Sequence, residues 1–182
     1  MDNKIVDNIA DAFNSDLPPA DTMDEYLDKI IPQIRHHSED LREEKFYVEK
    51  HWIEFRDDDD FHEITMHIFN PEGEYLRSID GDYHAGEWRY LSNKLIFGFK
   101  ESEGEIYELA FLDGDFFILK KHGNPKAMER RYFVLVKEAV ARKVEWRQAL
   151  ELLFNKYKNN NSFYITVAVI ILLIIAIIFA LS

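Results

Sequence analysis

The chain of 182 residues contains no cysteine. This excludes disulfides, thiol nucleophiles and Cys-ligated zinc, and it suits a reducing compartment. The chain also lacks a P-loop, a G-x-G-x-x-G fingerprint and a Ser in a G-x-S-x-G elbow. Because no catalytic constellation is visible, we expect a protein that is not an enzyme and that holds no metal ion or cofactor.

Basic residues are scarce in the first two thirds of the chain. Residues 1–119 carry a net charge of -19, whereas residues 120–158 carry +7. The acidic part would repel phosphates, so we expect no nucleic-acid binding, and we expect any protein partner to meet the acidic N-terminal half. The basic part serves either as ordinary topogenic charge or as a contact surface for anionic lipid.

One long apolar run stands out, and it lies at the C-terminal end. Residues 163–181 contain no charge, no Pro and no Gly. A helix of this length is about 28 Å long, close to the bilayer hydrocarbon core of about 30 Å. Residues 1–20 have no long apolar run of the kind found in a signal peptide. We therefore expect a tail-anchored, single-pass membrane protein, with residues 159–162 as a linker and the N-terminal domain in the cytoplasm.

The basic residues just before this run are candidates for contact with the membrane surface. A helix one short linker away from a bilayer keeps at least its last turn within about 8 Å of the surface, roughly one Debye length. The expected contacts with anionic lipid are Arg142, Lys143, Arg147, Lys156 and Lys158.

Residues 1–44 are expected to form an acidic helical arm. Ile5, Ile9 and Phe13 recur at helical spacing, which predicts a short amphipathic helix over residues 1–13. Thr22 and Glu25 then form a capping box for a second helix, with Pro32 as a kink or an end. Residues 36–44 either continue this helix or form a loop.

Residues 45–138 are expected to form an antiparallel β domain. Short aromatic and β-branched runs alternate there with turn signals, of which Asp113-Gly114 is the strongest for a type I′ hairpin. Such short connections join antiparallel neighbours. The predicted strands are 45–56, 61–69, 74–79, 86–91, 94–100, 105–112 and 115–121.

An eighth strand at 130–137 is favoured by its Tyr-Phe-Val-Leu-Val run, although Asn124-Pro125 also fits the start of one long helix. Trp146, Leu150 and Leu153 predict a basic amphipathic helix within residues 139–158. The fold class is thus α+β: an up-and-down meander of about seven or eight strands, as a curved sheet or small barrel, flanked by N-terminal helices and a C-terminal helix, plus one transmembrane helix.

Gly86-Glu87-Trp88, within this meander, resembles small lipocalin-like domains of the calycin type. The similarity covers residues 45–121 and is mostly a hydrophobic pattern. The resemblance implies the antiparallel β-meander. A carrier of a small apolar ligand would use the inside of such a barrel, as a cavity lined by aromatic side chains. The candidate ligand-binding residues are Trp88, Tyr90, Phe97, Tyr107 and Phe117. Further segments that carry the similarity are 69–75, 93–97, 107–109 and 116–119.

His62 and His67 lie near each other in the sequence but are five residues apart, so they miss the i, i+4 spacing of a zinc protease and point to opposite faces of a strand. We expect two exposed or edge histidines there. The favoured function is a membrane-anchored, non-catalytic binding or scaffold module. The alternatives are a carrier of a lipid or small apolar ligand and, more weakly, a membrane-tethered hydrolase using the acidic loops. A cavity lined by aromatic rings would favour the carrier, and a filled core the module.

Overall fold

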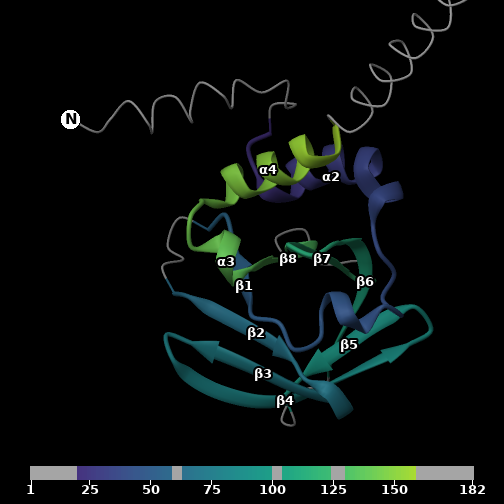
Figure 1. The fold of residues 1–182 in the computed structure, drawn as a ribbon, viewed down its shortest axis with the longest axis vertical. Helices are drawn as coiled ribbons and strands as arrows, with labels where there is room; N and C mark the ends of the chain where they lie inside the picture. Colours follow the sequence, from purple (N-terminus) through teal and green to yellow (C-terminus); the bar gives the residue numbers. More distant parts are fainter. Residues whose placement is uncertain (1–19, 59–62, 100–103, 124–129, 159–182) are drawn as a thin grey trace, which may run out of the picture.

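The computed structural model describes residues 20–58, 63–99, 104–123 and 130–158. Eight antiparallel strands form a closed barrel in the order β1 to β8, because β1 pairs with both β2 and β8 (Figure 1). The expected meander is therefore confirmed as an eight-stranded barrel, which is consistent with a lipocalin-like architecture. The strands are β1 Trp52–Phe55, β2 Thr65–Phe69, β3 Glu74–Ile79, β4 Asp82–Leu91, β5 Lys94–Gly98, β6 Glu105–Leu112, β7 Phe116–Lys121 and β8 Tyr132–Lys137.

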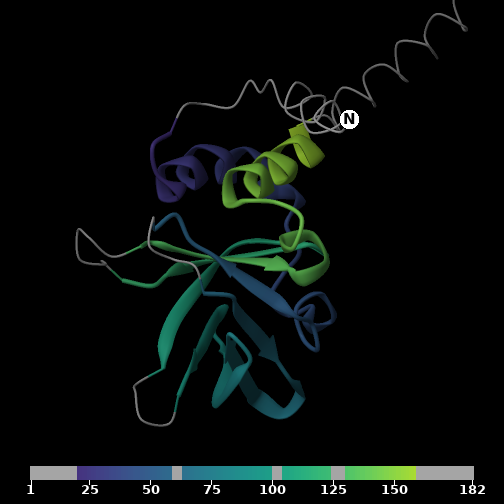
Figure 2. The same cartoon turned by 90° about the vertical axis from the view of Figure 1, so that its left-hand side faces the viewer.

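Two helices lie side by side over one flank of this barrel (Figure 2). The first is α2, Met23–Ile34, in which the Thr22 hydroxyl accepts a hydrogen bond from the Glu25 N–H as the capping signal predicts. Pro32 lies in the last turn and the helix ends two residues later, at Ile34. The second is α4, Trp146–Lys158, which buries Leu150 and Leu153. The short helix α3, Glu138–Ala141, joins β8 to α4, so the helix expected over residues 139–158 is divided into two.

The apolar residues form two clusters separated by the barrel wall. The outer cluster joins α2 and α4 to the outward-facing residues of β1, β6, β7 and β8. The inner cluster fills the barrel. Strands that face both clusters are apolar on both sides, as in the fully buried run Phe116–Leu119 of β7. The barrel wall is thus packed on both faces, by the two helices outside and by the aromatic interior within.

Several boundaries differ from the sequence expectations. Residues 45–51 are not strand, because the 3-10 helix η2 (Glu44–Phe46) and a turn precede β1. Asp80 and Gly81 both have positive φ and form the hairpin between β3 and β4, so β4 begins at Asp82 rather than at residue 86. The type I′ turn expected at Asp113-Gly114 is wrong, because neither residue has positive φ. Asp113 Oδ1 instead accepts the N–H groups of residues 115 and 116.

Gly86 of the lipocalin-like pattern has a clear structural role. A Cβ atom on this residue would lie 2.2 Å from the carbonyl oxygen of Gly98 on β5. The two strands approach too closely there for any other residue.

Residues 124–129 and the predicted helix 1–13 lie outside the described residues, as does the apolar run 163–181. Within the described ranges, the structure contains no helix that is long and apolar enough to cross a membrane. The eighth strand is confirmed over residues 132–137, which settles the choice between strand and long helix for that segment.

Candidate functional site

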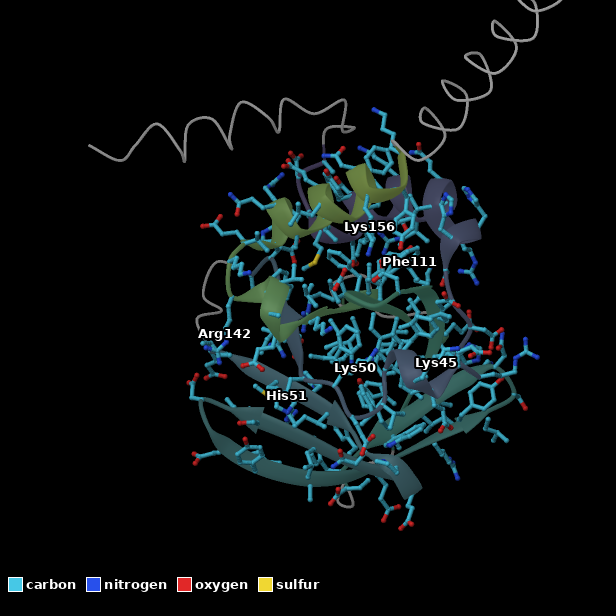
Figure 3. All side chains as sticks on the ribbon, in the orientation of Figure 1. Lys45, Lys50, His51, Phe111, Arg142 and Lys156 are labelled. Atoms are coloured by element: carbon cyan, nitrogen blue, oxygen red, sulfur yellow. The ribbon has the colours of Figure 1, made fainter. Side chains whose placement is uncertain are left out.

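The two ends of the barrel interior differ in chemistry. One end is crossed by the segment before β1, which carries Lys45 and Lys50 (Figure 3) and inserts Tyr47 among the inner rings. The rings of Tyr47 and Phe117 lie 5.2 Å apart, and Phe69 lies 6.1 Å from Trp88. We call this the closed end. Its side chains fill the space between the strands.

The other end is the one at which β1, β3, β5 and β7 finish, and we call it the open end. Alternate side chains of each strand still point into the barrel at this end, but here those side chains are polar. On β1, Glu54 follows Trp52 on the inward face, and on β2, His67 precedes Phe69. Arg77 is paired directly with His67 across the β2–β3 ladder and therefore shares the inward face. The periodicity of the sequence did not predict that Glu54 and Arg77 face the barrel interior, and His67 was expected at an exposed or edge position.

A buried hydrogen-bonded chain runs across the open end. Glu54 Oε2 lies 3.1 Å from His67 Nε2, and His67 Nδ1 lies 2.6 Å from the Tyr75 hydroxyl. Glu54 Oε1 accepts hydrogen bonds from Arg56 Nε at 2.6 Å and from Arg130 Nη2 at 3.3 Å. All three members of the chain are almost fully buried. His67 is therefore not the exposed or edge histidine that the sequence suggested.

The charge states of this chain follow from its contacts. Burial alone would raise the pKa of Glu54, but hydrogen bonds from His67 and Arg56 outweigh it and lower that pKa to about 2. Burial lowers the pKa of His67, opposed only in part by Glu54. An ionised Glu54 can only accept, so a neutral His67 donates from Nε2 and accepts the Tyr75 proton at Nδ1. Both ring nitrogens are thus occupied.

A recess of about 380 Å³ opens beside this chain. Lys121 Nζ reaches Glu105 Oε1 at 2.9 Å, and the Tyr107 hydroxyl donates to the other oxygen of Glu105. Burial opposes these bonds, yet they lower the pKa of Glu105. The residues lining the recess are Asp58, Glu105, Tyr107, Lys121, Arg130, Arg131, Tyr132 and Phe133.

Arg77 stands on the opposite wall of the open end. Its guanidinium carbon lies 4.3 Å from the centre of the Phe99 ring. Its Nε is buried and has no hydrogen-bond partner in the part of the chain that the structure describes. A buried N–H without an acceptor is costly, so a donor left in this state is open to an acceptor from outside the chain.

Cations outnumber carboxylates on the inward face of the open end. The cations are Arg56, Arg77, Lys121, Arg130 and Arg131, and the carboxylates are Glu54, Asp58 and Glu105, which leaves a local charge of +2 in a chain whose net charge is -12. Arg131 also pairs with Asp24 and Asp28 of α2. Within the described ranges, no group of three or more His, Asp or Glu side chains is arranged to hold a metal ion.

The five aromatic residues predicted to bind a ligand are brought together by the barrel. Trp88, Phe97, Tyr107 and Phe117 are buried in the inner cluster, and Tyr90 packs against it. Their rings contact other rings, as in the stacked pair Phe97 and Tyr107 at 4.8 Å. Of the five, Tyr107 also lines the recess.

The five residues predicted to contact lipid lie on or near α4, and most have partners within the protein. Lys156 Nζ lies 2.9 Å from Asp113 Oδ2 and 3.0 Å from Asp115 Oδ2, beneath α4 (Figure 3). Arg142 pairs with Glu138. Arg147 donates to backbone oxygens of Ala20 and Asp21, at the start of α2. Lys143 is exposed, and Lys158 lies in the last turn of α4.

Comparisons with protein-family models, with curated proteins and with solved structures find no match to this chain. The description of the fold therefore rests on the strand pairing of the barrel alone.

Proposed function

We propose that the protein is a non-catalytic binding module whose open barrel end binds the carboxylate or phosphate group of a small ligand. The observation that carries this proposal is the excess of cations at the open end, together with the buried Nε of Arg77, which has no hydrogen-bond partner among the described residues. Arginine presents planar donors that match carboxylate and phosphate oxygens. Lys121 and Arg130 line the recess and would contact the anion directly.

The filled closed end favours this function over the transport of a lipid. A lipid carrier needs an apolar cavity that takes up most of its ligand. Here the inner cluster is packed with rings in edge and stacked contacts, centred on Phe69 and Phe117. An apolar ligand would have to displace these rings from one another.

The state of the buried chain favours binding over hydrolysis. A general base has to reach the proton that it removes, and a nucleophile has to be activated. Both ring nitrogens of His67 already take part in hydrogen bonds. Burial raises the pKa of the Tyr75 hydroxyl above its ordinary value. The chain Glu54–His67–Tyr75 therefore fixes the wall of a binding site.

The module is held at a membrane, in this proposal, by the apolar run 163–181, with the barrel in the cytoplasm. Support comes from the length of the run and from the basic residues before it. Protease treatment of intact cells tests the placement: the barrel should be protected, and digestion of residues 1–158 from outside would contradict it.

Calorimetric titration of the full chain with inorganic phosphate and with acetate, at constant ionic strength, tests the ligand class. We expect phosphate to bind with a dissociation constant on the order of 1 mM, because a small anion offers few contacts. Arg77→Gln and Arg130→Gln should each weaken binding about tenfold.

Arg89→Gln is the matched control, since Arg89 carries the same charge on the exposed outer face of β4. It should bind phosphate as the unmodified chain does. Equal affinities for all four proteins, or no binding of either anion, would refute the proposed function. Stronger binding of acetate than of phosphate would identify the ligand group as a carboxylate.

A further inference from the structure

A second concave surface lies outside the barrel, where α3 and the start of α4 meet β1 and β2. It has a volume of about 740 Å³, and we call it the flank groove. Its apolar lining consists of Ile53, Phe55, Ile64, Met66, Ala141 and Trp146. The groove lies along the outer side of β1, and it meets the open end where this strand finishes: Glu54 and Arg56 line its edge and pair with each other, and Asp58 lines both the groove and the recess.

The apolar lining is only partly covered by the protein. Phe55, Met66 and Trp146 are partly buried against the outer cluster. Ile64 is 63% exposed, which is unusual for a large apolar side chain beside a concave surface. The groove therefore offers a contact that a second apolar surface would complete.

The lining of the groove is acidic. It carries six carboxylates and two guanidinium groups, a net charge of -4. Arg56 is committed to Glu54, and Arg142 to Glu138 at the edge of the groove (Figure 3). The lining carboxylates are those of Glu54, Asp57, Asp58, Glu63, Glu138 and Glu145.

Three exposed carboxylates of this lining have no ion pair with a described residue. Asp58, Glu63 and Glu145 form no ion pair with any of the residues that the structure describes. All three side chains are exposed. An apolar lining flanked by unpaired negative charge is complementary to a surface with apolar and basic faces.

We propose that the flank groove binds a basic amphipathic helix of a partner protein. Such a helix lays its apolar side chains into a groove, and its Lys or Arg residues reach the carboxylates at the edge. The chain's own residues 1–19 precede Ala20, whose carbonyl accepts a hydrogen bond from Arg147, the neighbour of Trp146 in the groove. These residues carry four Asp and one Lys. Their net charge of -3 would be repelled by the lining.

The test uses a dye-labelled peptide of 14 residues that contains only Leu and Lys, with Leu at helical spacing. Binding to the full chain in phosphatidylcholine nanodiscs is measured by fluorescence anisotropy, with empty nanodiscs as background. We expect binding above background that weakens as salt is added. A peptide with Glu in place of every Lys should not bind.

Two variants remove the two kinds of contact. Glu63→Lys combined with Glu145→Lys should weaken binding at least tenfold, because two attractive contacts become repulsive. Ile64→Asp should have a similar effect through the loss of apolar contact. Both changes are on exposed side chains, so the fold is preserved.

Matched controls make the same changes elsewhere. Glu39→Lys combined with Glu44→Lys reverses the same charge between α2 and β1, and Leu91→Asp replaces a side chain that is 55% exposed at the end of β4. Both controls should bind as the unmodified chain does. Equal loss in controls and groove variants, binding of the Glu peptide, or no binding above empty nanodiscs would overturn the proposal.

Deletion of residues 1–19 separates the two possible occupants. If the groove is free for a partner, the Leu–Lys peptide should bind the shortened chain with unchanged affinity. A several-fold gain in affinity on deletion would show that the chain's own N-terminal segment occupies the groove, and it would overturn the choice of a partner helix.

Discussion

The closed and open ends of the barrel interior are built by the same strands but are stabilised by different physics. At the closed end, Trp52 and Phe69 pack among other rings, and the indole N–H of Trp52 donates to the Tyr47 carbonyl at 3.0 Å. Two residues away on the same strands, after Trp52 and before Phe69, Glu54 and His67 face the same interior. The first end is held by apolar burial, which does not depend on pH, and the second by hydrogen bonds to a charge.

This difference assigns stability and function to different ends. A close-packed aromatic core resists any change of volume, so it leaves no room for a ligand. A buried polar chain is stable only when each donor and acceptor is paired, and at the open end Arg77 Nε is a buried donor with no partner among the described residues. Mutations should therefore separate the ends by their effects on unfolding, on pH dependence and on anion affinity.

The largest expected effect is at the closed end. Phe69→Ala removes a ring that contacts Tyr47, Trp88, Phe97 and Phe117, and it should lower the free energy of unfolding by about 4 kcal/mol. Urea unfolding of the full chain measures this. Phe69→Leu keeps much of the volume and should cost less than about 1.5 kcal/mol. A loss below about 2 kcal/mol for Phe69→Ala would mean that the closed end is loosely packed.

Glu54→Gln should have the next largest effect, at the open end. The folded pKa of Glu54 is about 2, below its ordinary value of 4.5, so the unfolded chain binds more protons between these values. The resulting stability is present above pH 4.5 and is lost as the pH falls toward 2. We expect the variant to be about 3 kcal/mol less stable at pH 7. The free energies of unfolding of the two proteins should converge as the pH falls. A constant difference between them from pH 7 to pH 3 would contradict an ionised Glu54.

Protonation of His67 should cause a smaller loss of folding stability than protonation of Glu54, and at a higher pH. The folded pKa of His67 lies below 6.5, so the unfolded chain takes up a proton first when the pH falls below 6.5, and stability then decreases. We expect the unmodified chain to lose about 1–2 kcal/mol between pH 6.5 and pH 5. His67→Gln should show a flat profile over this range. A similar decline in the variant would assign the effect to other groups.

Arg77→Gln should have the smallest effect on folding and a clear one on binding. Its Nε has no hydrogen-bond partner among the described residues, so the variant breaks no hydrogen bond of this atom and removes a buried donor that lacks an acceptor. The free energy of unfolding should therefore fall by less than about 0.5 kcal/mol. The same variant should lose most of its phosphate affinity. Circular dichroism and urea unfolding verify the fold, and a loss above about 2 kcal/mol would show that Arg77 is part of the core.

Much of the fold follows from local patterns in the sequence. Alternating aromatic and β-branched runs identified the positions of all eight strands, and the Thr22 cap marked the start of α2 to the residue. The hairpin signal at Asp113-Gly114 failed because the Asp113 side chain bonds the following N–H groups. A local side-chain bond replaced the backbone turn that the dipeptide usually favours.

The candidate site was harder to find, because it depends on register. Glu54 and His67 are ordinary polar residues in the sequence, and strand pairing is needed to show that they face each other. One signal was present: both lie two residues from a large aromatic on the same strand, in the phase of the buried face. A polar residue in that phase indicates a buried polar contact. Arg130, which comes from outside the strands, gave no such signal.

Anions are proposed to bind the open end and to leave the closed end unchanged. Nuclear magnetic resonance of the full chain, labelled with ¹⁵N and titrated with inorganic phosphate, observes both ends at once through side-chain N–H signals. The Nε–H signals of Arg77 and Arg130 should shift with a common dissociation constant. The indole signals of Trp52 and Trp88, whose N–H groups are bonded to the Tyr47 and Asn70 carbonyls, should stay in place. Indole signals that shift while the two arginine signals remain unchanged would contradict the claim.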